Sequence, residues 1–85
     1  MTALETIREA KENGCQLVRP RKDQPLQYDC KFFAVGGKKK GWIYLDSFTA
    51  SHVTNVYNAV KPEYQEKLSK LSLLRLIDVC WKVAS

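Results

Sequence analysis

Three side chains in the middle of the chain have the types used in nucleophilic catalysis: Asp46, Ser51 and His52. Such a set works when the histidine takes the proton of the serine while the acid orients the histidine ring. Ser51 and His52 are neighbours on a predicted helix, so their side chains point about 100° apart. We therefore interpret Asp46 as a helix cap and His52 as a residue on a solvated helix face. The G-x-S-x-G, H-E-x-x-H and phosphate-loop motifs are also missing, so we expect no enzyme.

The three cysteines, Cys15, Cys30 and Cys80, and the single histidine are the residues that could bind a transition metal. Their spacing matches neither a zinc finger nor a zinc ribbon, and the sequence has no C-x-x-C pair. An odd number of cysteines also argues against a disulfide framework. We interpret them as reduced thiols used mostly as small core residues, and we expect no metal site and no cofactor.

The positive charge of the chain is concentrated in its middle third. The chain has 14 Lys and Arg residues against 9 Asp and Glu residues, a formal net charge of +5. Segment 15–45 has seven basic residues and two acidic ones, which accounts for the whole excess. A concentrated positive region favours an anionic partner through long-range attraction. The candidate anion-binding residues are Arg19, Arg21, Lys22, Lys31, Lys38, Lys39 and Lys40.

This cationic segment has two interpretations. Lysines at a turn are often there only for solubility, and lysines near an edge strand discourage pairing between sheets. The arginine-rich end and the lysines at 38–40 lie at opposite ends of a strand about 33 Å long, so they need not form one patch. Neighbouring aromatic residues could stack on bases if they lie on an open sheet face, or they could pack under helices. These aromatic residues are Tyr28, Phe32, Trp42 and Tyr44.

The elements that must position these residues follow the order helix, three strands, three helices. Two predicted helices cover residues 2–13 and 62–68. A further helix runs from a cap at Asp46, Ser47 or Thr49 to Val60, and the last runs from a cap at Ser69 or Ser72 to Ala84. The predicted strands cover 15–18, 26–35 and 42–45. The glycine-rich segment 36–41 predicts a turn, so that the second and third strands form a hairpin. We expect one domain over residues 1–85, of the α+β class. It has a small antiparallel sheet of two or three strands, with an N-terminal helix and three C-terminal helices packed on one face.

The last predicted helix is apolar over most of its circumference. Its polar side chains, Arg75, Asp78 and Lys82, form one narrow stripe. Such a helix must be covered on several sides, and a domain of this size covers one of them. We therefore expect Leu74 and Trp81 to anchor an interface with a partner or with a second copy, because buried aromatic residues dominate interface energetics. The alternative is that Trp81 is an ordinary core residue.

Three segments of the helical half carry a resemblance: LDSFTAS at 45–51, VYNAV at 56–60 and DVCWKV at 78–83. In these segments the chain resembles small orphan proteins encoded by bacteriophages and other mobile elements. The resemblance implies an accessory protein that binds a host factor and blocks it, as anti-defence inhibitors do. It identifies no binding residue.

These observations predict a non-catalytic binding module that acts on a host protein or nucleoprotein in the cytoplasm of the host cell. The alternative is a small basic nucleic-acid-binding protein that uses the cationic segment 19–40, and a third hypothesis is a self-assembly role such as a homodimer. No apolar run reaches the ~18 residues of a membrane span. No secretory signal is visible either, so we expect no membrane partner.

Overall fold

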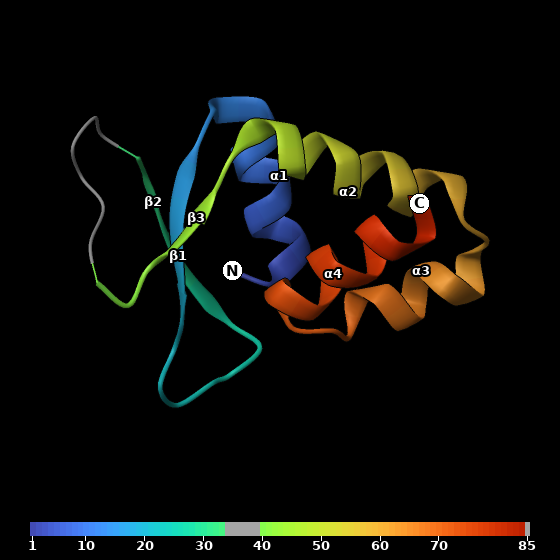
Figure 1. Ribbon diagram of the computed structural model, residues 1–85. Coiled ribbons are helices and arrows are strands. Elements are labelled where there is room, and N and C mark those ends of the chain that lie inside the picture. Colours follow the sequence, from blue (N-terminus) through green and yellow to red (C-terminus); the bar gives the residue numbers. More distant parts are fainter. Residues whose placement is uncertain (34–39, 85) are drawn as a thin grey trace.

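The computed structural model describes residues 1–33 and 40–84. Four helices lie on one side of a three-stranded sheet (Figure 1), which confirms the predicted α+β class. The elements in chain order are α1 (Ala3–Asn13), β1 (Gln16–Pro20), β2 (Tyr28–Phe32), β3 (Ile43–Leu45), α2 (Ser47–Ala59), α3 (Pro62–Ser69) and α4 (Leu73–Ala84).

The sheet has β1 at its centre, in the order β2–β1–β3, and both strand pairs are antiparallel. Val18 of β1 lies opposite Cys30 of β2 on one side and Ile43 of β3 on the other. The predicted hairpin between the second and third strands is therefore wrong, because β3 pairs with β1. The physical reason is that Leu17 and Val18 are consecutive and both buried. A strand that buries both of its faces belongs in the middle of a sheet.

Strand β1 runs beyond its predicted end and includes Pro20. Pro20 lies opposite Tyr28, next to a ladder bond in which the Arg21 N–H donates to the carbonyl oxygen of Gln27 at 2.9 Å. On the other side, the pairing with β3 has already ended at Val18. The N–H that proline lacks is therefore not needed at this position.

The helices begin where the local sequence predicts. At the start of α1 the Thr2 hydroxyl accepts from the Glu5 N–H at 3.2 Å, and the Glu5 carboxylate accepts from the Thr2 N–H at 2.9 Å. This is the predicted capping box. At the start of α2 the Asp46 carboxylate accepts from the Thr49 N–H at 2.6 Å, which confirms Asp46 as a cap. Pro62 occupies the first position of α3, where its missing N–H has no partner to lose.

The core lies between the inner face of the sheet and the helices. Val18, Leu45, Val53 and Leu76 are essentially inaccessible to solvent there. Tyr28 crosses from β2 to α4, where its hydroxyl accepts a hydrogen bond from the Leu73 N–H at 2.8 Å. That N–H belongs to the first turn of a helix, which has no partner for it within the helix. Tyr28 therefore joins the sheet to the last helix.

Candidate functional site

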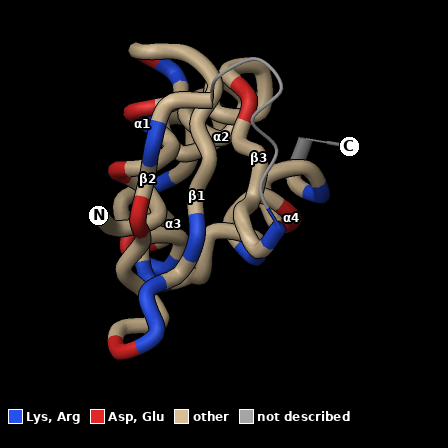
Figure 2. The backbone as a smooth tube through the Cα atoms, turned by 90° about the vertical axis from the view of Figure 1, so that its left-hand side faces the viewer, with Lys and Arg blue, Asp and Glu red and all other residues tan. Residues whose placement is uncertain are grey.

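No helix within residues 1–33 and 40–84 covers the outer face of the sheet, which lies opposite the four helices (Figure 1). The strand register shows which side chains it carries. Leu17 lies opposite Lys31 and Tyr44, and Arg19 lies opposite Asp29. Side chains of paired residues project from the same face of a sheet. Figure 2 shows the molecule from this side, with basic residues on β1, on β2 and on the loop that joins them.

Two cations lie over the ring of Trp42, the residue directly before β3. The Arg19 guanidinium carbon is 4.5 Å from the ring centroid, and the Lys31 ammonium nitrogen is 4.3 Å from it. Both distances are within the range of cation–π attraction. Arg19 comes from β1 and Lys31 from β2, so this cluster spans the width of the sheet. Leu17, on the same face, is only 2% exposed, and stems and rings of long neighbouring side chains are able to cover an apolar residue in this way.

Next to this cluster, Tyr44 and Phe33 form an aromatic pair on the same face. Their ring centroids are 4.9 Å apart with an interplanar angle of 69°, an edge-to-face contact. The Tyr44 hydroxyl donates a hydrogen bond to the Cys15 sulfur at 3.2 Å, and this bond raises the pKa of Tyr44. The Tyr44 ring is therefore held by the Phe33 ring and through its own hydroxyl, while 43% of the residue stays exposed.

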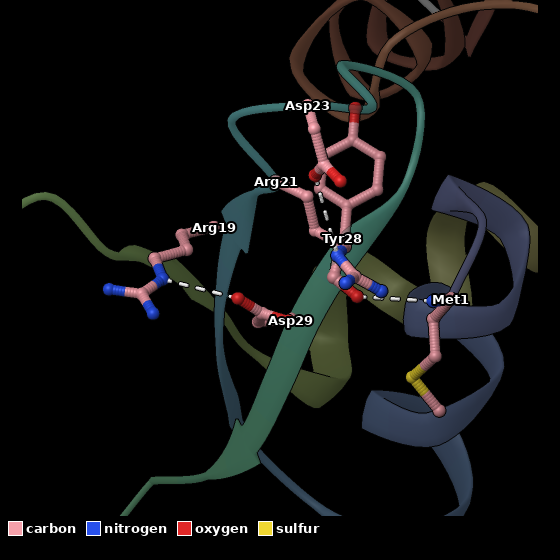
Figure 3. A network of polar contacts seen from close by, with 6 residues as sticks. All are labelled: Met1, Arg19, Arg21, Asp23, Tyr28 and Asp29. Atoms are coloured by element: carbon pink, nitrogen blue, oxygen red, sulfur yellow. Dashed lines mark hydrogen bonds and ion pairs between the residues drawn. The ribbon is translucent and has the colours of Figure 1, made fainter.

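Acidic residues accompany the cations where β1 runs into the loop that leads to β2, as Figure 3 shows. The Arg19 Nε lies 3.4 Å from an Asp29 carboxylate oxygen, and the Arg21 Nε lies 4.0 Å from one of Asp23. Exposed ion pairs of this kind contribute about 0–1 kcal/mol to stability. They line a hollow of about 390 Å³ together with two neighbours, Pro20 and Lys22. Figure 3 also shows the Met1 amino group donating to the Tyr28 carbonyl oxygen at 3.1 Å.

The structure brings together the first four of the predicted anion-binding residues, at positions 19, 21, 22 and 31. Lys40 is exposed just before Trp42, whereas Lys38 and Lys39 lie outside the described residues. Among the aromatic candidates, Trp42 and Tyr44 are on the outer face. Tyr28 and Phe32 project toward the helix side instead, because they alternate with Lys31 along β2.

The sequence analysis missed Phe33 and Leu17 as parts of this face. Phe33 directly follows β2, and it breaks the alternation of polar and apolar residues along that strand. Leu17 and Val18 are consecutive apolar residues, and this pattern is the signal that both faces of β1 are covered.

A second exposed surface, the α2–α4 surface, is formed by Phe48, His52, Leu74 and Trp81. Phe48 is 75% exposed and Trp81 is 40% exposed, and their ring centroids are 6.2 Å apart. The Trp81 ring stacks on His52 at 3.9 Å with an interplanar angle of 13°. His52 is therefore half-buried rather than fully solvated, and its Nε2 donates to the Cys80 carbonyl oxygen at 3.1 Å. Leu74 and Trp81 are both exposed, and their interface stays a prediction.

The cysteines are all free thiols, and they lie in different surroundings. Cys80 is buried in the core as predicted, whereas Cys15 and Cys30 are half-buried on opposite faces of the sheet. Burial raises the pKa of Cys80 and of Cys30, so both thiols stay protonated at neutral pH. Within the described part of the chain, no three His, Cys, Asp or Glu side chains are arranged to hold a metal ion.

No family model, no curated protein and no solved structure matches this chain. None of the helices in residues 1–33 and 40–84 has the length and apolar character needed to cross a membrane.

Proposed function

We propose that the protein is a non-catalytic binding module whose outer sheet face binds a nucleic acid, either free or within a nucleoprotein. The observation that carries this proposal is the ring of Trp42 with Arg19 and Lys31 over it, on a sheet face that no helix covers. Nucleic-acid sites combine cations that contact phosphates with aromatic rings that contact bases. The net charge of +5 adds long-range attraction to a polyanion.

A purely acidic protein surface fits this face less well. Such a partner would use the cations, but it offers no flat rings to match Tyr44 and Phe33 beside them. A nucleic acid uses both kinds of side chain, because its phosphates and its bases alternate along the strand. The aromatic pair therefore favours a nucleic acid over another polyanion.

The setting of this proposal is the cytoplasm of a bacterial host. The resemblance of the helical half to bacteriophage and mobile-element proteins supports an accessory role there. By occupying a nucleic acid or nucleoprotein, such a small module blocks the host machinery that needs the same surface. An anti-defence inhibitor is one example of this action.

The test is fluorescence anisotropy with labelled DNA and RNA, each as a single strand and as a duplex. At least one of them should bind, with an affinity that falls roughly 20- to 40-fold between about 50 and 200 mM salt if three phosphates are contacted. The double variant Arg21→Glu/Lys22→Glu should lose at least about tenfold in affinity, because these exposed loop residues adjoin the Trp42 cluster.

The matched control is Lys61→Glu/Lys67→Glu. It makes the same change in net charge at exposed positions around α3, away from the sheet (Figure 1). It should change the affinity far less than the loop variant. Failure of every polynucleotide to bind at low salt would contradict the proposal, and so would equal losses in the two variants.

The α2–α4 surface favours a second candidate function, contact with a host protein. Exposed apolar surface of this kind marks protein-binding sites, and the stacked rings of Phe48 and Trp81 are its largest members. Phe48→Ala should weaken the association without lowering stability, because its ring is mostly exposed. Pull-down from a nuclease-treated bacterial lysate measures the association. Sedimentation at high protein concentration distinguishes a homodimer, and a strict monomer that captures no protein would remove this candidate.

A further inference from the structure

We infer that the ligand of the outer sheet face is single-stranded, with an unpaired base stacked against the exposed ring of Tyr44. The inference rests on the proposed function and names the class of nucleic acid that the face takes. It follows from two features of this face: an exposed aromatic residue that a base could contact, and cations that phosphates could contact.

The exposed aromatic ring separates single strands from duplexes. In a duplex the faces of the bases are stacked on one another, and a protein reaches only their edges in the grooves. A single strand presents base faces, which stack on aromatic side chains whatever the sequence. Tyr44 is an aromatic residue that is 43% exposed, and it lies on the same face as the cations of β1 and β2. An exposed ring beside cations can bind a strand with unpaired bases, whereas a duplex offers no free base face to the ring.

Trp42, which is half-buried, and Tyr44, which is exposed, have different roles on this face. Trp42 already has Arg19 and Lys31 over its ring, so its part is to hold these two cations in place. Tyr44 contacts the Phe33 ring and donates its hydroxyl to the Cys15 sulfur, so its ring is held in place before a ligand binds. A ring that is fixed before binding loses little side-chain entropy when a base stacks on it. Tyr44 is therefore the stacking residue.

The cations are placed to take the phosphates that flank the stacked base. Asp29 contacts Arg19 through Nε, which leaves the terminal guanidinium nitrogens pointing away from that carboxylate (Figure 3). A guanidinium presented in this way can bind a phosphate through two hydrogen bonds. Lys31 is the second cation at the Trp42 ring. A single nucleotide on this face could thus stack its base on Tyr44 and place its flanking phosphates near Arg19 and Lys31.

The experiment compares three labelled probes of equal length: a strand of about 12 thymidines, its abasic counterpart, and a duplex. The thymidine strand should bind roughly 5- to 100-fold more tightly than the abasic strand, because one base–ring stack contributes this much. Tyr44→Leu should remove that preference, and Tyr44→Phe should keep it. The matched control is Tyr64→Leu, since Tyr64 is also an exposed tyrosine but lies on α3.

The outcomes separate this inference from the proposed function. Equal binding of all three probes to the wild-type protein, or preference for the duplex, overturns the inference and leaves a charge-driven nucleic-acid module. No binding of any probe at low salt overturns the proposed function itself. Circular dichroism would show whether Tyr44→Leu folds. If it does not fold, the comparison of the three probes with the wild-type protein still tests whether the ligand is single-stranded. A thymidine preference that survives in folded Tyr44→Leu also overturns the role of Tyr44.

Discussion

The two faces of the same three strands are built in opposite ways. On the inner face Val18, Tyr28 and Leu45 are buried, and helices that are distant in the sequence provide the cover. On the outer face Leu17 is buried to the same extent, but no helix lies over it. Lys31 and Tyr44 lie opposite Leu17 in the neighbouring strands, and the Arg19 guanidinium lies over the Trp42 ring on the same face.

This difference indicates on which face of the sheet a substitution leaves the fold intact. A side chain of the inner face is locked by several elements, so moving it disturbs the fold. A side chain of the outer face is held by a few neighbours and keeps its polar end in water. We expect mutations on the inner face to act on stability and mutations on the outer face to act on binding.

The largest difference should appear between Leu45→Ala and Leu17→Ala, which make the same change on the two faces. Leu45→Ala should lower the free energy of unfolding by about 2–5 kcal/mol, because rigid helix packing leaves a cavity. Leu17→Ala should fall at or below the lower end of this range, because the flexible side chains around it can collapse onto the smaller residue. Urea denaturation measures both. An equal or larger loss for Leu17→Ala would mean that the outer face is as rigid as the core.

A smaller difference should separate two tyrosine hydroxyls. Tyr28→Phe leaves the Leu73 N–H buried without its partner, so it should lower the free energy of unfolding by about 1–3 kcal/mol. Tyr44→Phe removes an exposed bond to sulfur on the outer face and should change stability by less than about 0.5 kcal/mol. Thermal melts of both variants test this. A Tyr44→Phe variant as unstable as Tyr28→Phe would contradict the division between the faces.

The smallest expected effect is the loss of stability at low pH that comes from Glu5 in α1, a helix that covers the inner face. The hydrogen bond from the Thr2 N–H holds the pKa of Glu5 below its ordinary value of about 4.5. The contribution of Glu5 to stability is therefore complete above that value and is lost as the pH falls through the lower, folded-state pKa. Glu5→Gln keeps an acceptor at this position but does not titrate. Its stability should thus fall less than that of the wild type between pH 5 and pH 3, and parallel losses would show that the capping box makes no pH-dependent contribution.

Sequence reasoning succeeded where the signal is local. Thr2, Asp46 and Pro62 mark helix starts through hydrogen bonds or a missing N–H within a few residues, so those starts could be predicted. Strand pairing could not, because the glycines at 36 and 37 favour a hairpin locally. The order β2–β1–β3 depends instead on burial of both Leu17 and Val18, which only the assembled helices and outer side chains provide.

The candidate site was predictable in its residue types and only in part in its arrangement. The basic residues of β1 and its following loop could be recognised from charge alone. Which aromatic residues join them depends on the face of the strand on which each lies. Alternation along β2 sends Tyr28 to the core, and the pairing of β3 with β1 brings Trp42 over to Arg19. The contribution of Lys38 and Lys39 stays a prediction.

The hydrogen bond between Tyr28 and Leu73 also affects when the chain can finish folding during translation. The two partners are 45 positions apart, so Tyr28 is synthesised well before the α4 residue that it contacts. Until then the nascent polypeptide holds a sheet whose inner side lacks its final cover. We therefore expect folding to complete only after α4 has emerged from the ribosome, and shortened chains that lack α4 should be captured by chaperones or degraded.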